Sequence, residues 1–225
     1  MMQSPHPLER MLGMNWYAGD TPGIRGILKQ VPEDFIVEEI PLPFSEEGPF
    51  LLCRLWKRNW ETQRAVREIA KRLRISHKRI SWAGTKDKRA VTIQYISIPD
   101  LPPEEIEAMS LKDISLEIVG RTQKPLSLGS LSGNRFRLAI RACDTEELEN
   151  RVRAGVATAA EGVPNYFGIQ RFGVIRPVTH LVGKHILRGD FEEAVRVYIG
   201  MAYPDEPEPT RSARAAYYDD RNAAD

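Results

Sequence analysis

The residue best placed to do chemistry in this sequence is Asp87, a carboxylate flanked by the cations Lys86, Lys88 and Arg89. A strand-like run precedes this polar loop and another follows it, so we expect the loop to present Asp87 from the rim of a sheet. Neighbouring cations favour the ionised form of a carboxylate. Such an aspartate can act as a nucleophile or a base on a polyanion that the cations hold. A solvated hairpin turn is the alternative reading, because Gly and Asp also suit turns.

The loop ends the most basic part of the chain. Residues 54–89 hold thirteen Lys and Arg against three acids, although the net charge of the whole chain is only +1. Trp56, Trp60 and Trp82 lie in the same segment. RNA-binding surfaces combine cations that neutralise phosphates with flat groups on which bases stack. The segment therefore indicates an RNA-binding surface, with a solvated helix face as the alternative.

Composition excludes several classes of protein. The 225 residues, 42% of them hydrophobic, suffice for one substantial core or two small ones. Two isolated cysteines provide neither a disulfide framework nor a metal site. The first ten residues lack the apolar stretch of a signal peptide, and the sequence has no run of about 18 apolar residues. We therefore expect a cytoplasmic protein without a membrane span or a bound metal.

The elements that must position Asp87 mix strands and helices without regular alternation. Hydrophobic periodicity predicts strands at residues 24–30, 35–40, 50–57, 80–83, 91–98, 114–119 and 134–141. It predicts helices at residues 61–74, 103–109 and 145–161, and two more within 180–200, interrupted at 189–190. Asn59 or Thr62 is expected to cap the first helix and Asp144 the third. This pattern predicts an α+β fold, with a mixed or antiparallel sheet and helices on one face.

Four segments resemble the TruD family of tRNA pseudouridine synthases and its eukaryotic relatives, in content, order and spacing. The loop from Ala83 to Thr92 and the run Asn165-Tyr166-Phe167-Gly168-x-Gln170-Arg171-Phe172-Gly173 are the most specific. The other two are residues 26–39 and 131–136. The resemblance spans about residues 23–200 and implies a pseudouridine synthase catalytic domain there, as its N-terminal portion. Residues 1–22 would be a lead-in. Residues 201–225, rich in proline and acids, would be a linker or the start of an inserted domain.

The resemblance implies isomerisation of a uridine in tRNA, most often the one at position 13, with no cofactor. Asp87 would be the catalytic aspartate, as nucleophile or as base, acting on a base flipped out of the RNA. Lys29 would pair with Asp87 and orient it. Phe35 and Phe136 would hold or replace the base, and the amide of Asn134 would bind the uracil edge.

Lys86, Lys88, Arg89 and Arg171 are the candidate contacts to RNA phosphates, which position the nucleic acid without reading its sequence. The expected partner is tRNA, and the sequence leaves the oligomeric state open. Family members usually carry further material beyond this length. A non-catalytic RNA-binding module, or an inactive fragment of such an enzyme, is therefore the alternative function.

Overall fold

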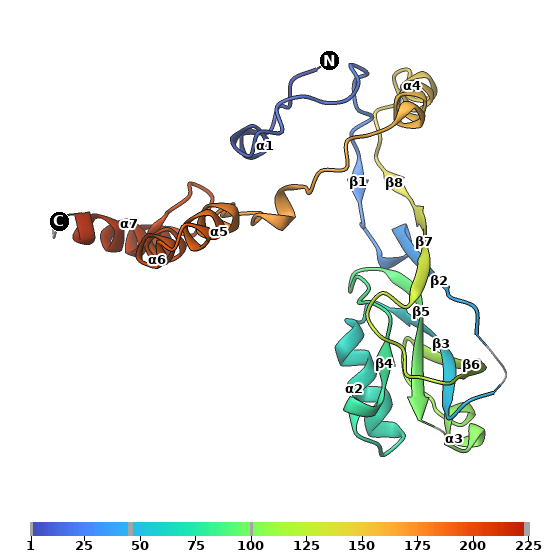
Figure 1. The fold of residues 1–225 in the computed structure, drawn as a ribbon. Helices are drawn as coiled ribbons and strands as arrows, with labels where there is room; N and C mark the ends of the chain where they lie inside the picture. Colours follow the sequence, from blue (N-terminus) through green and yellow to red (C-terminus); the bar gives the residue numbers. More distant parts are fainter. Residues whose placement is uncertain (1, 45–46, 100, 223–225) are drawn as a thin grey trace. The chain divides into compact units, whose positions relative to one another are not determined.

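The computed structural model describes residues 2–44, 47–99 and 101–222, and the chain divides into two compact units. The first, here called the sheet unit, runs from Ile24 to Glu146 and contains the Asp87 loop. The second, here called the helical unit, combines Met1–Gly23 with Glu147–Asp225. Figure 1 shows the strands gathered in the first of these units and a succession of helices in the second.

The sheet unit is built on a six-stranded sheet in the order β6-β3-β5-β2-β7, with the short β4 pairing to β5. Its strands are β2 (Phe35–Pro41), β3 (Phe50–Arg58), β4 (Ser81–Trp82), β5 (Val91–Pro99), β6 (Ile114–Thr122) and β7 (Leu131–Leu138). The pair β2–β5 is parallel, and the remaining pairs are antiparallel. The two short strands β1 (Ile27–Leu28) and β8 (Ile140–Arg141) form a separate antiparallel ribbon.

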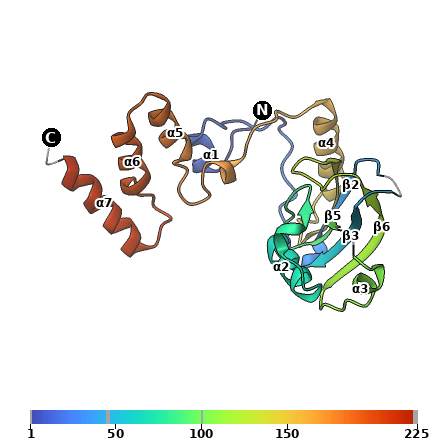
Figure 2. The same cartoon turned by 60° about the horizontal axis from the view of Figure 1, so that its bottom comes forward.

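Helix α2 (Thr62–Arg72) covers one face of this sheet (Figure 2). The register places alternate residues of β3 opposite alternate residues of β5, so Leu51 faces Ile98 and Cys53 faces Ile96. These apolar side chains are fully buried and form one core with the apolar side of α2. Helix α3 (Pro103–Glu107) adds Ile106 to the same core. Two single 3-10 turns, at Pro32–Asp34 and His77–Arg79, complete the unit.

The helical unit contains five helices and one 3-10 turn among its described residues. They are α1 (Pro7–Met11), α4 (Leu148–Glu161), the turn Ile169–Arg171, α5 (Thr179–Leu187), α6 (Phe191–Gly200) and α7 (Glu208–Asn222). Helix α6 packs against both α5 and α7. Val178, Val197 and Tyr203 form a small buried cluster there. The break between α5 and α6 comprises residues 188–190, which include the predicted residues 189–190, and Asp190 caps α6.

The predicted fold class is confirmed: the sheet is mixed, mostly antiparallel, and carries α2 on one face. The strand predicted at residues 24–30 shrinks to two residues, because Arg25, Gly26 and Lys29 all adopt positive φ, which interrupts an extended strand. The strand predicted at 134–141 is likewise split between β7 and β8, and these belong to different sheets.

Both predicted caps are corrected by the structure. Helix α2 is capped by Glu61, whose carboxylate accepts hydrogen bonds of 2.8 Å from the amides of Gln63 and Arg64. Helix α4 begins only at Leu148, because Glu147 has a left-handed backbone, and Asp144 instead lies 3.6 Å from Arg25.

The acidic, proline-containing C-terminal segment includes a helix, α7, where composition indicates a linker. Its prolines stand before or within the first turn, where a missing N–H costs no helical hydrogen bond. The alanines that follow favour the helix. Whether residues 201–225 connect to an inserted domain stays a prediction.

Candidate active site

Asp87 lies in the loop that joins β4 to β5, and its side chain is 52% exposed. The Nζ atom of Lys29 is 3.4 Å from its Oδ1 atom. The guanidinium of Arg89, two residues further on, donates a hydrogen bond of 2.8 Å to the carbonyl of Gln30. These two contacts hold the loop that carries Asp87 beside residues 29–30, which include Lys29, the predicted cationic partner of Asp87.

The backbone of Lys29 is left-handed, with φ of 54°, an uncommon conformation for a residue with a side chain. From this position the Nζ atom also lies 3.7 Å from the centre of the Phe35 ring. One ammonium therefore contacts both the carboxylate of Asp87 and an aromatic face. Backbone strain of this kind concentrates at functional sites, which makes Lys29 a candidate for function as well as structure.

The aromatic surface continues from β2 to β7. The rings of Phe35 and Phe136 lie edge to face, with centroids 6.1 Å apart, and Phe136 is 57% exposed. Asn134 stands two residues before Phe136 on β7, so it belongs to the same face of the sheet, and it too is exposed. The structure therefore brings Asp87, Lys29, Phe35 and Phe136 into one series of contacts, with Asn134 on the same face.

Asp34 positions the start of β2. Its buried carboxylate accepts hydrogen bonds from the Arg141 guanidinium at 2.9 and 3.0 Å and from the amide of Val31 at 3.0 Å. The hydrogen bond from Arg141 holds the pKa of Asp34 below its usual value. These contacts fix the 3-10 turn that leads directly into Phe35.

The four candidate RNA-binding cations fall in different environments. Lys88 and Arg89 are exposed next to Asp87. Lys86 points inward: its side chain is 7% exposed, and its Nζ atom lies 2.5 Å from the fully buried carboxylate of Glu39. This is the environment of a structural ion pair, so Lys86 is not presented to a phosphate on the surface.

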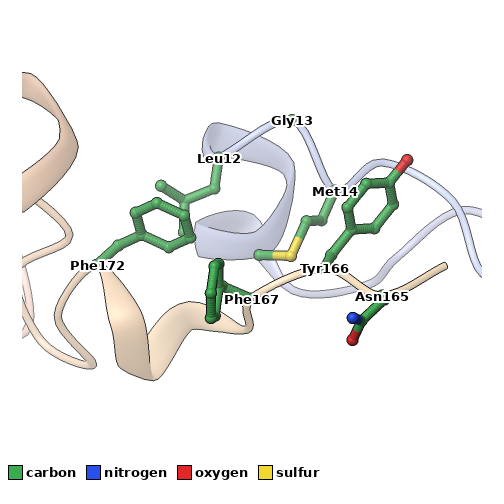
Figure 3. A pocket seen from close by; sticks show the side chains of 7 residues that line it. All are labelled: Leu12, Gly13, Met14, Asn165, Tyr166, Phe167 and Phe172. Atoms are coloured by element: carbon green, nitrogen blue, oxygen red, sulfur yellow. The ribbon is translucent and has the colours of Figure 1, made fainter. Parts of the chain in front are cut away.

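Arg171 belongs to the helical unit, where its guanidinium lies 5.4 Å from the centre of the Phe167 ring. The aromatic run 165–172 contributes to a pocket of about 350 Å³ within that unit (Figure 3). Leu12, Gly13 and Met14 line it from one chain segment, and Asn165, Tyr166, Phe167 and Phe172 from another. Figure 3 shows the side chains of Met14 and Phe167 turned toward each other across it.

Sequence reasoning missed the buried polar residues behind the loop, namely Glu39, Lys57, Thr62 and Gln94. A signal for one of them was present. Leu51, Cys53 and Leu55 alternate on the inward face of β3, so the same period carries Lys57 into the interior. A lysine at an inward position is rarely buried unless it has partners.

Neither a metal site nor a membrane span is found in the part of the chain that the structure describes. No group of three or more His, Cys, Asp or Glu side chains gathers there in a way that could hold a metal ion. None of the helices described is long and apolar enough to cross a membrane. Both cysteines are free thiols, and burial raises the pKa of Cys53 to about 12.

The fold and the site together define a class: an α+β protein that presents an aspartate beside a lysine and an aromatic pair at one face of a mixed sheet. Comparison with known proteins identifies the family. The family model for "tRNA pseudouridine synthase D (TruD)" matches residues 11–225. This chain belongs to the TruD family.

Two archaeal relatives carry the name "Probable tRNA pseudouridine synthase D". The protein from Methanosarcina barkeri is 50% identical over 218 residues, which cover 95% of this chain and 50% of the relative. The protein from Methanococcoides burtonii is 47% identical over 220 residues, which cover 96% and 50%. A crystal structure from Methanosarcina mazei, assigned to the same family, is 48% identical and superimposes with a TM-score of 0.88. That match covers 94% of this chain and 50% of that one, so the chain spans about half the length of these relatives.

Proposed function

We propose that this chain carries the catalytic aspartate of a tRNA pseudouridine synthase, and that the residue is Asp87. The observation that carries the proposal is the contact series Asp87–Lys29–Phe35–Phe136, found in a member of the TruD family. The ammonium can orient the carboxylate for reaction with the ribose of a uridine, and the flat apolar rings nearby can hold the base by stacking.

The reaction balances without a cofactor, because it is an isomerisation. The bond from uracil N1 to the ribose C1′ breaks, and the uracil turns while it is held. A bond from C5 to C1′ then forms, C5 loses its proton, and N1 gains one. Asp87 acts either by attack on C1′ or by removing a proton from the sugar. Both roles use a carboxylate oxygen, and the ammonium of Lys29, 3.4 Å from the Oδ1 atom, helps to hold the carboxylate in place.

The other residues divide between the base and the backbone of the RNA. A uridine in folded tRNA, most often that at position 13, must leave its stack before it can react. Phe35 and Phe136 would stack with the flipped base or occupy the place it left, and Asn134 would bind the uracil edge. Lys88, Arg89 and, from the helical unit, Arg171 would contact phosphates. We also propose that the protein works in the cytoplasm, as expected of a protein that modifies tRNA.

Lys86 is left out of the phosphate-binding set, because its ion pair with Glu39 is buried. A non-catalytic RNA-binding module is the second candidate function. It is favoured by one observation, that the loop exposes the cations Lys88 and Arg89, which would bind RNA whether or not Asp87 reacts.

The test measures pseudouridine in tRNA transcripts. It uses this chain and a chimera completed with the part of the M. mazei relative that the chain does not cover. Asp87→Asn should abolish product and leave tRNA affinity within about twofold. The control Glu117→Gln changes an exposed carboxylate on β6 of the same unit, and it should alter neither product formation nor tRNA affinity. Full turnover by Asp87→Asn would exclude Asp87 as the catalyst. Tight tRNA binding with no product from either protein would favour the binding module.

A further inference from the structure

Lys57 is the most deeply buried cation of the sheet unit among the residues described, and the proposed function gives it no role. It continues the inward row of β3 after Leu55, and its side chain is fully buried. The register places it opposite Thr92, near the start of β5, and the Asp87 loop leads directly into this end of the strand. Burying an ammonium is unfavourable unless it is hydrogen-bonded or paired, so its contacts should explain its presence.

The ammonium of Lys57 is bound by main-chain oxygens. It donates a hydrogen bond of 2.7 Å to the carbonyl of Trp60, just before α2, and one of 3.1 Å to the carbonyl of Asp87. The second contact links β3 directly to the residue that carries the proposed catalytic carboxylate. It bridges 30 positions of the sequence.

Two other buried side chains bind the same loop from below. The Thr62 hydroxyl oxygen accepts a hydrogen bond of 3.0 Å from the amide of Lys86. The side-chain amide of Gln94 donates one of 3.2 Å to the carbonyl of Gly84, and Gln94 also bonds Thr62 at 3.1 Å. We call Lys57, Thr62 and Gln94 the brace. Together they bind main-chain groups at three of the four positions from 84 to 87.

We propose that Lys57 is a positioning residue for Asp87, acting through the backbone of the loop. The inference rests on the proposed function. Fixing the carbonyl of Asp87 restricts the backbone torsions on either side of its Cα atom, and so the direction in which the carboxylate leaves the loop. Misplacement of a catalytic group by about 1 Å can cost about 100-fold in rate, so a brace of this kind has a measurable effect.

The charge on Lys57 makes the proposal testable by pH. Burial lowers the pKa of Lys57 to about 8. The carboxylates of Glu61 and Asp87 act in the opposite direction, and the ammonium of Lys86 in the same direction as burial. Above this pKa the amine is neutral and binds the Asp87 carbonyl less strongly, because charged donors form the stronger hydrogen bonds. Turnover that depends on the brace should therefore fall as the pH rises through about 8.

The experiment compares kcat and KM of the active protein, this chain or the chimera, with those of Lys57→Met and Lys57→Gln between pH 6.5 and 9.5. We expect Lys57→Met to lower kcat about 10- to 100-fold with KM within about twofold. Lys57→Gln retains a donor and should recover part of the loss. Both variants should lack the decline in kcat near pH 8 that we expect in the unsubstituted protein. Ionisation of the substrate affects all the proteins alike, so it does not account for a difference between them. Lys112→Met, an exposed lysine of the same unit outside the basic segment, should leave every parameter unchanged.

A direct measurement covers the case in which a variant folds poorly. NMR titration of the side-chain carbon next to Nζ in the unsubstituted protein should place the pKa of Lys57 near that of the kinetic decline. A Lys57 pKa near 10.5, or unchanged kcat and pH profile in Lys57→Met, overturns the positioning role. If Lys57→Met retains the kcat and pH profile of the unsubstituted protein while Asp87→Asn abolishes product, only this inference fails. If Asp87→Asn retains full turnover, the proposed function fails with it.

Discussion

Lys86→Met should destabilise the sheet unit more than any substitution of an exposed cation in the same loop. The substitution keeps most of the aliphatic stem but leaves the fully buried carboxylate of Glu39 without its cation, which lies at 2.5 Å. The amide of Tyr95, 3.2 Å from Glu39, would be one remaining donor. Removing one partner of a buried pair costs about 3–5 kcal/mol, because the other charge stays buried.

The assay is urea unfolding followed by tryptophan fluorescence. Three of the four tryptophans, at positions 56, 60 and 82, lie in the sheet unit, so the signal reports mainly on that unit. With a slope of about 1–3 kcal/mol per molar urea, a loss of about 3 kcal/mol lowers the midpoint by about 1–3 M.

The matched control is Lys88→Met, which removes the same charge two residues away from an exposed position. A surface substitution of this kind changes stability by about 0.5 kcal/mol or less. The double variant Glu39→Gln/Lys86→Met should regain much of the loss, because no buried charge is then left alone. Equal stability of Lys86→Met and Lys88→Met would refute the structural role of Lys86 and return it to the phosphate-binding candidates.

Two further predictions concern buried polar groups. Thr92→Val should raise the free energy of unfolding by about 1 kcal/mol in urea titrations, because the Thr92 hydroxyl is buried without a hydrogen-bond partner among the described residues. Thr62→Val, at a hydrogen-bonded hydroxyl, should lower it, and the same sign for both variants would contradict the assignment. The lowered pKa of Asp34 contributes stability above the unfolded-state value of 3.8, and this contribution is lost as the pH falls through the folded-state pKa. Asp34→Asn should therefore flatten the acid limb of a plot of stability against pH, and an unchanged limb would show that the contact with Arg141 contributes nothing to it.

Local pattern was sufficient for most of the sheet and for α2. The alternation in residues 35–40, 50–57, 91–98 and 114–119 predicts strands that the structure contains, with ends shifted by a few residues. The failures have local causes that a hydropathy pattern does not register. Positive φ at Arg25 and Lys29 cuts β1 short, and the left-handed Glu147 delays the start of α4.

The site was predictable only in part, because its contacts join residues far apart in the sequence. The composition of the loop indicates Asp87 as the candidate catalytic residue. The family resemblance adds Lys29, Phe35 and Phe136 as candidate site residues. The pairing of Lys86 with Glu39 spans 47 positions and depends on the parallel register of β2 with β5. Nothing in the local sequence distinguishes Lys86 from its exposed neighbour Lys88, which is why both were predicted to bind RNA.

The brace has a consequence for the way this region tolerates change over evolution. Its hydrogen bonds to the loop end on main-chain atoms, and these are present whatever side chain a position carries. Thr85 is exposed in the loop itself. In a saturation mutagenesis library selected for activity, this surface position should accept many residues. The interior positions 57, 62 and 94 should accept few, so the most restricted residues outside the site would be ones that the RNA never contacts.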